Sequence, residues 1–169
     1  ELTAGDNITI DENNVISSAG SALNAVYFKA RGGAKTTIES GSILAYNTLI
    51  FNEGNGYNPS TYKFTAPIAG LYHFTLSFFS LTSDTFAGEV NIIQDDGTTE
   101  TIIEHFRNNG YSKRFGSVIT FCNVGDKIFS RCTLYQIQID DGTRDGLGYQ
   151  KCNFSGFLIT EKSSGGIPT

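Results

Sequence analysis

The feature that most constrains the fold of this chain is a series of short runs in which large apolar and polar residues alternate. The clearest run is Gly70–Phe79, where one side of the alternation holds Tyr72, Phe74, Leu76 and Phe78. A period of two is typical of a β-strand with one buried face. Turn signals recur at intervals of roughly 8–15 residues, and no stretch has a sustained helical period with caps. The sequence therefore predicts an all-β domain with about ten short strands, as in sandwiches and jelly rolls.

Two of these runs are separated by the sequence Ala-Pro-Ile-Ala-Gly, at residues 66–70. Pro67 lacks the backbone N–H that a strand ladder needs, and Gly70 tolerates backbone conformations that other residues avoid. We therefore expect Phe64 to lie near the end of one strand, a corner to follow, and a second strand to begin at Gly70.

Other candidate strands follow in close succession, separated by turns rich in Gly, Asn and Asp. Their segments are Asn24–Ala30, Thr48–Asn52, Tyr62–Thr65, Phe86–Ile93, Thr99–Phe106, Arg114–Cys122, Lys127–Ile139 and Cys152–Thr160. The turn at Asp95-Asp96-Gly97 predicts a hairpin between the fourth and fifth of these segments.

The composition is that of one β-rich domain with appendages. Phe (13) and Gly (19) are abundant among the 169 residues, and aromatics favour strands whereas glycines favour turns. We expect one domain over residues 22–161 and a flexible polar tail at 162–169. At 1–21 we expect a stalk-like segment, in which Ile8–Ile10 and Val15–Ile16 predict a β-hairpin.

Charge and hydropathy argue against two classes of partner. The formal net charge is −5 and no run of Lys or Arg could cover phosphates, so we expect no nucleic-acid partner. No segment is apolar over the length that a membrane-spanning helix needs, so we expect no membrane insertion. The chain starts at Glu1 without a signal peptide, which indicates a mature product or a fragment.

The three cysteines, Cys122, Cys132 and Cys152, are too few for a disulfide scaffold and lack the Cys-x-x-Cys spacing of zinc sites. They fit small apolar side chains on strands. The alternative is one disulfide with one free thiol.

The segment from residue 46 to residue 76 resembles the signature of the complement C1q globular-head family. Tyr46 and Leu76 stand where the family has Phe and an aromatic residue, and both remain large and apolar. The positions that match the signature in order and spacing are Tyr46, Asn52, Tyr57, Phe64, Gly70, Tyr72, Phe74 and Leu76.

The resemblance extends over Leu23–Thr160, because "GSVITFCNVGDKIF" and "FSGFLIT" are similar to later family strands and come in the same order. It implies a ten-stranded C1q/TNF-like jelly roll that forms a compact homotrimer. The segment "LTAGDNITIDENNVISSAG" resembles the shaft repeats of viral or phage fibres, which are trimeric. The chain holds this fibre-like hairpin where the family usually has a collagen Gly-X-Y stalk.

Candidate ligand-binding residues gather in the segment "RNNGYSKR". In a jelly-roll trimer such loops carry recognition, and Asn, Tyr and Arg suit contacts with sugars or protein surfaces. The alternative is a solvated hairpin loop without a ligand. The candidates are Arg107, Asn108, Asn109, Tyr111, Lys113 and Arg114.

A second candidate is a calcium site, formed by Asp140, Asp141 and Asp145. Clustered carboxylates with intervening glycine suit calcium, although the spacing is not that of an EF-hand and Asp-Gly is also ordinary turn chemistry. Asp95-Asp96-Gly97 has the same two interpretations. We expect no other cofactor.

The remaining conspicuous residues favour structure over catalysis. A core or subunit-seam position fits the aromatic residues better than a sugar platform does; these are Tyr57, Phe64, Tyr72, Phe74 and Phe78. His73 falls on the face opposite to its neighbours and fits a surface or subunit-contact position. His105 lies in a charged stretch. No nucleophile–base, metalloprotease or phosphate-loop motif occurs, so we expect no enzyme.

The sequence thus predicts a non-enzymatic recognition module, extracellular or on a virion surface. It would be a trimeric head at the tip of a fibre that binds a cell-surface receptor or glycan. One alternative is a secreted C1q-type lectin or innate immune recognition protein. Another is a structural trimerisation cap without a ligand.

Overall fold

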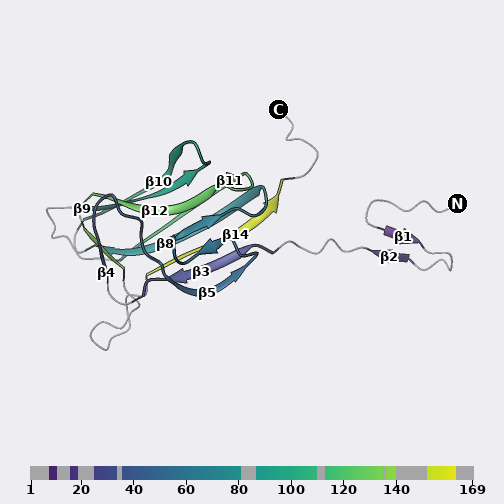
Figure 1. The fold of residues 1–169 in the computed structure, drawn as a ribbon, viewed down its shortest axis with the longest axis horizontal. Helices are drawn as coiled ribbons and strands as arrows, with labels where there is room; N and C mark the ends of the chain where they lie inside the picture. The colour runs from purple at the N-terminus through teal and green to yellow at the C-terminus, as the bar shows by residue number, and fades with distance from the viewer. Residues whose placement is uncertain are drawn as a thin grey trace.

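The computed structural model describes residues 8–10, 16–18, 25–33, 36–80, 87–109, 113–134, 136–139 and 152–162. These residues form only strands and their connections (Figure 1). The strands are β1 Ile8–Ile10, β2 Ile16–Ser18, β3 Tyr27–Arg31, β4 Thr36–Ile38, β5 Thr48–Glu53, β6 Tyr57–Asn58, β7 Lys63–Thr65, β8 Gly70–Ser80, β9 Ala87–Asp95, β10 Glu100–Asn109, β11 Lys113–Cys122, β12 Lys127–Leu134, β13 Ile137–Ile139 and β14 Asn153–Glu161.

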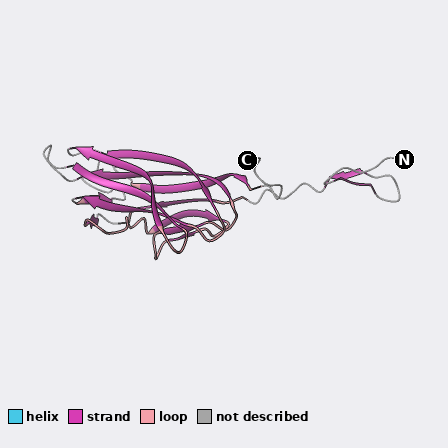
Figure 2. Ribbon diagram, turned by 90° about the horizontal axis from the view of Figure 1, so that it is seen from above, coloured by secondary structure: helices cyan, strands magenta, loops and turns pink. Residues whose placement is uncertain are grey.

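Two antiparallel sheets are stacked as a sandwich, which is visible edge-on in Figure 2. One sheet has five strands in the order β10-β9-β12-β7-β6. The other has seven, in the order β4-β13-β8-β14-β3-β5, with β11 also paired to β8. Neighbouring strands such as β3 and β14 are far apart in sequence, which is typical of a jelly roll. The predicted all-β jelly roll is confirmed.

Most of the predicted strands coincide with observed ones, whereas β4 and β6 were not predicted. The corner at 66–70 separates β7 from β8, and the Asp95-Asp96-Gly97 turn joins β9 to β10 in a hairpin. The predicted segment Lys127–Ile139 contains two strands, β12 and β13, which belong to different sheets. The N-terminal hairpin is present as β1 paired with β2. Its assignment to a stalk stays a prediction, since residues 19–24 lie outside the described part of the chain.

Aromatic rings from both sheets fill the centre of the sandwich. Phe28 stacks on Tyr57 with ring centroids 4.7 Å apart and meets Phe154 edge-on at 5.1 Å. Phe64 contacts Phe74 at 5.3 Å. All five are at most 3% exposed, so the predicted core role of the signature aromatics is confirmed. Offset and edge-on ring pairs add stability beyond the area that they bury.

The polar atoms of the signature residues are paired inside the core. Tyr46 donates its hydroxyl to the carbonyl of Ser77 at 3.0 Å, and Tyr57 donates to the carbonyl of Tyr46 at 2.8 Å. Burial raises the pKa of both phenols. A tyrosine at position 46 therefore fits where the family has Phe, because its hydroxyl has an acceptor within the core.

Gly70 is required for a reason other than the predicted one. It is not among the glycines with positive φ, so backbone freedom does not explain it. A Cβ at this position would lie 2.3 Å from the carbonyl oxygen of Thr160 on the neighbouring strand β14. Glycine is present because two backbones approach each other closely at the start of β8.

All three cysteines are buried thiols that form no disulfide, which supports the first of the two interpretations. Burial raises the pKa of Cys122 to about 12 and that of Cys132 to about 11. Thiols held protonated in this way are poor nucleophiles, so these cysteines serve as small apolar side chains.

Candidate assembly face and recognition end

The outer face of the seven-stranded sheet carries apolar side chains that the chain itself leaves exposed. Ile119 on β11 lies opposite His73 on β8, His73 lies opposite Phe157 on β14, and Phe157 lies opposite Tyr27 on β3. We call these four residues the cross-strand strip. The ring of His73 meets that of Phe157 edge-on at 5.3 Å. The three apolar members are between 42% and 59% exposed, which is unusual for contiguous large side chains.

On the same face, the strip extends to edge strand β5, and a second row of side chains lies beside it. The ring of Phe51, on edge strand β5, contacts Tyr27 at 5.5 Å. The next row consists of Ser117, Thr75 and Ser155, with Lys29 beyond them, and Thr75 shares a 2.7 Å hydroxyl hydrogen bond with Ser155. The face is therefore an apolar band beside a band of short hydroxyl side chains.

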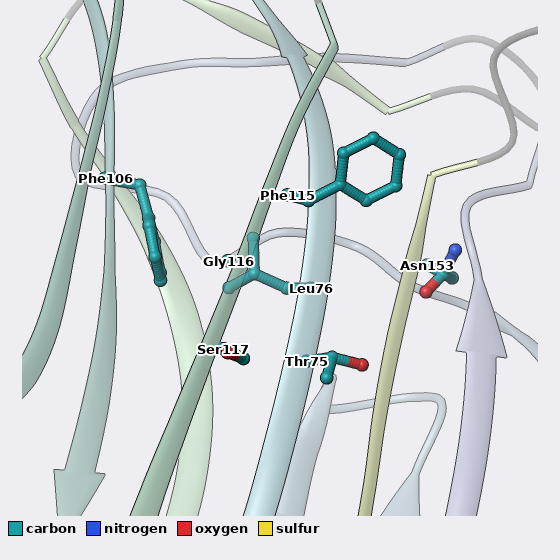
Figure 3. Close-up of a pocket in the computed structure, with 7 residues that line it drawn as sticks. All are labelled: Thr75, Leu76, Phe106, Phe115, Gly116, Ser117 and Asn153. Atoms are coloured by element: carbon teal, nitrogen blue, oxygen red, sulfur yellow. The ribbon is translucent and has the colours of Figure 1, made fainter.

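A depression of about 430 Å³ lies beside this hydroxyl row (Figure 3). Phe115, which is 71% exposed, stands at its rim. Gly116 leaves room for Phe106 from β10, because a Cβ there would lie 2.2 Å from that ring. The other lining residues are Thr75, Leu76, Ser117 and Asn153, so the depression has hydroxyl, amide and apolar walls and no charged group.

The outer face of the five-stranded sheet is different around Phe129, because the charged side chains there neutralise one another. Arg131 donates two hydrogen bonds to Glu100, at 2.6 and 2.9 Å. These bonds lower the pKa of the Glu100 carboxyl and raise that of the guanidinium. Lys63 lies 3.7 Å from Asp95 and 4.2 Å above the ring of Phe129. Charged side chains thus cover the aromatic ring on this face.

The predicted ligand-binding residues that the structure describes lie at one end of the sandwich. We call this the distal end, since it is opposite to the end where the chain enters β3 and leaves β14 (Figure 1). Arg107 is near the end of β10, and Lys113 and Arg114 begin β11, so they flank a short connection rather than a long loop. Arg107 and Arg114 are exposed, and Lys113 lies 4.9 Å from the ring of Phe115. The structure describes only the backbone of Asn108 and Asn109, and Tyr111 lies outside the described residues.

The predicted calcium ligands Asp140, Asp141 and Asp145 also lie outside the described residues. Within the described ranges, no cluster of three or more His, Cys, Asp or Glu side chains could hold a metal ion. At the second candidate, the Oδ1 atom of Asp96 accepts bonds from the backbone N–H groups of Thr98 and Thr99 and from the Thr98 hydroxyl. These bonds lower the pKa of the carboxyl and are those of an ordinary turn.

The cross-strand strip was missed from the sequence as a unit. The alternation did place His73 on the face opposite to Tyr72 and Phe74, and the structure confirms this. An available signal was that Phe115, Ile119 and Phe157 continue the alternation of their own strands on the side away from the core. Their common row depends on strand order, which no local pattern contains.

Comparisons with known proteins agree with this architecture. The model of the C1q domain family matches residues 27–159, so the chain belongs to the C1q family. The globular domain of zebrafish complement 1qA superposes with a TM-score of 0.61 at 14% identity, over 81% of this chain and 99% of that one. Eiger TNF from S. frugiperda gives 0.65 at 8% identity, over 86% and 99%. Murine APRIL at pH 5.0 gives 0.58 at 8% identity, over 80% and 99%.

The family defines the class of this protein. C1q and TNF-like domains are non-enzymatic recognition or cytokine-like modules, usually extracellular and typically homotrimeric. The chain is accordingly a recognition module and not an enzyme. The structure has no helix in its described part that is long and apolar enough to cross a membrane.

Proposed function

We propose that this chain forms a homotrimeric head that binds a cell-surface receptor or glycan at its distal end. The observation that carries the proposal is the contrast between the two outer faces of the sandwich. One face leaves Ile119, Phe157 and Tyr27 uncovered, whereas charged side chains cover Phe129 on the other. An uncovered apolar face on a recognition module marks an interaction surface.

The occupant of this face is a second copy of the chain. The face has few fixed charges near the strip and therefore suits an equally apolar surface rather than a charged ligand. A closed threefold ring uses two different patches of each subunit, so one face can be covered by another part of its neighbour. Burial of the exposed Phe, Tyr and Ile side chains would stabilise the assembly at about 25 cal/mol per Å² of apolar area.

The distal end is the recognition site in this proposal. Arg107, Lys113 and Arg114 gather there, on strand ends that a rigid sandwich holds in place. Arginine and lysine donors suit the hydroxyl, carboxylate or sulfate groups of a glycan, and also a protein receptor. Three copies on one trimer give avidity, so each site can be weak.

The proposed position of the head at a fibre tip rests on the end of the sandwich opposite to the distal end. The chain enters β3 and leaves β14 at the end opposite to the proposed site (Figure 1). Segment 1–21 would connect the head to a trimeric stalk, and β1 with β2 supplies the hairpin that shaft-like repeats use. On this basis the location is outside a cell or on a virion surface.

The trimer is tested by sedimentation equilibrium of the whole chain near neutral pH. A mass three times that of the chain is expected, and a monomer at all concentrations would contradict the assembly. Recognition is tested separately, by binding of the intact trimer to a glycan array and to cells. Substitution of Arg107, Lys113 and Arg114 by Ala should abolish the binding while the trimer remains.

The alternatives give different results in the same assays. Deletion of segment 1–21 should lower the melting temperature of the trimer if that segment forms a trimeric stalk, and should leave it unchanged in a secreted C1q-type lectin. A ligand-free trimerisation cap would show no binding on either the array or cells. Separately, a calcium site at Asp140, Asp141 and Asp145 predicts that added calcium raises the melting temperature, because a ligand that binds only the folded state stabilises it.

A further inference from the structure

His73 is the one ionisable side chain of the cross-strand strip that can become a cation at mildly acidic pH. It is half-buried at the middle of the row, with the exposed side chains of Ile119 on one side and Phe157 on the other. Histidine is the side chain whose charge changes between about pH 5 and pH 8. The apolar strip therefore has a titratable group within its row.

No carboxylate faces His73 from the adjoining strands. On its own strand the same-face neighbours are Leu71 and Thr75, and the opposed residues of β11 and β14 are Ile119 and Phe157. The nearest charged groups across the face are Lys29 on β3 and Glu53 on β5, which are two and three strands away. At the end of the sheet where β8 begins, the Nζ atom of Lys162 lies 5.6 Å from the centroid of the Phe121 ring, and Glu161 lies opposite Gly70.

We propose that His73 makes the homotrimer sensitive to pH, so that its protonation at mildly acidic pH weakens the assembly. This inference rests on the proposed function, in which a second copy covers the strip. Covering the strip would remove water from His73 without supplying a counter-charge from its own subunit. A buried cation without a partner is strongly unfavourable, so the assembled state holds the neutral imidazole.

The sign of the pH effect on assembly follows from proton binding in the separated and the assembled chain. The separated chain exposes part of the ring to water and binds the proton more readily than the assembled chain does. Assembly must therefore release protons as the pH falls, and the association constant decreases with decreasing pH. Three copies each release up to one proton, so the constant can fall by up to about a thousandfold per pH unit in the acidic limit.

The chain has a natural internal control, because its two histidines lie on different sheets. His105 is on β10, where its Nε2 atom lies 3.6 Å from a carboxylate oxygen of Glu89. His105 thus has a carboxylate neighbour and lies outside the strip. Changing His105 should leave the pH response of the assembly intact.

The test is a dilution series by analytical ultracentrifugation of the full chain at about pH 7.5, 6.5 and 5.5 and constant ionic strength. The variants are His73→Phe and His73→Gln, with His105→Gln as the control. If the trimer is too tight to dissociate on dilution, subunit exchange between fluorescently labelled trimers measures its dissociation rate, which should rise at acidic pH in the same variants. We expect the association constant of wild type and His105→Gln to fall at least about tenfold over this range, and that of both His73 variants to stay within about threefold.

The outcomes separate the two proposals. A chain that is monomeric at about pH 7.5 would overturn the trimer and this inference together. A wild-type trimer whose association constant is independent of pH would overturn the role of His73 alone. An equal fall in the His73 variants would assign the effect to other groups and would also refute the inference. Circular dichroism at each pH confirms that the separated subunits remain folded.

Discussion

Strand β14 carries one phenylalanine on each side of the seven-stranded sheet. Phe154 is fully buried among the rings of Phe28 and Tyr57, whereas Phe157 is 48% exposed on the outer side, where its ring meets that of His73. The two residues are chemically identical and three positions apart, yet the chain covers only one of them. The inner side of this sheet therefore stabilises the fold, whereas the outer side contributes little until another surface covers it.

The largest loss of stability is expected on the inner side of the sheet, for Phe154→Ala. Removing a fully buried Phe ring leaves a cavity and should lower the free energy of unfolding by about 3–5 kcal/mol. Urea denaturation measures this loss. The experiment uses a Phe157→Lys background, which should be monomeric, so that assembly does not contribute to the measured stability. Phe115→Ala on the outer side is the matched control and should change it by no more than about 0.5 kcal/mol. Equal losses from both would show that the outer side also stabilises the monomer.

The next effect is expected on the outer side, for Phe157→Lys. A lysine in the cross-strand strip would place an uncompensated charge in the proposed contact and should convert the trimer to monomer, with little change in the circular dichroism spectrum. Leu134→Lys, at a 41% exposed residue of the five-stranded sheet, is the control and should remain trimeric. Sedimentation equilibrium of both variants measures their oligomeric state. A trimeric Phe157→Lys protein would place the subunit contact elsewhere.

The inner side of the sheet was predictable from the sequence for a local reason. Side chains alternate along a strand, so Tyr72, Phe74 and Leu76 had to share one face and His73 the other. The family signature then assigned Tyr46 and Phe64 to the same core, and both are buried. The bonds of their polar atoms were not predictable, since the acceptor of Tyr46 is the carbonyl of Ser77, 31 residues away.

The outer side was not predictable, because it is a property of strand order. Ile119, His73, Phe157 and Tyr27 come from strands that are distant in sequence and adjacent only after the sheet has formed. The sequence drew attention instead to the charged segment around Arg107 and Arg114, where residue type is informative without any knowledge of neighbours. The role of Gly70 was misassigned for the same reason, since the backbone that excludes a side chain there belongs to distant Thr160.

A smaller effect on the inner side is expected for Asn52→Ala. The Asn52 side chain accepts a bond from the backbone N–H of Tyr57 at 3.0 Å and donates to its carbonyl at 2.9 Å, which holds the turn between β5 and β6. Losing both should lower the free energy of unfolding by about 1–3 kcal/mol. Asn58→Ala removes only a single exposed bond to the N–H of Ser60 and should cost less than about 0.5 kcal/mol. Similar losses in the two denaturation curves would mean that the Asn52 side chain does not support the core.

The smallest effect at neutral pH is expected for Tyr72→Phe, which tests the inner side through its response to alkali. Burial raises the pKa of Tyr72 to about 12, although its hydroxyl also donates to the carbonyl of Ile68 at 2.8 Å. The unfolded phenol titrates near pH 10, so the folded state keeps its proton more tightly. The stability from this group is complete below about pH 10 and is lost as the pH rises toward about 12.

Tyr72→Phe keeps the ring and removes this titration. The variant should therefore lose less stability than wild type between about pH 9 and about pH 11 in urea denaturation, after a small loss at neutral pH from the missing hydrogen bond. Tyr46 and Tyr57 still titrate in the variant, so the alkaline loss is reduced and not abolished. Superimposable alkaline profiles would show that the Tyr72 hydroxyl reaches water in the folded state, and that the inner side of β8 is less closed than that of β14.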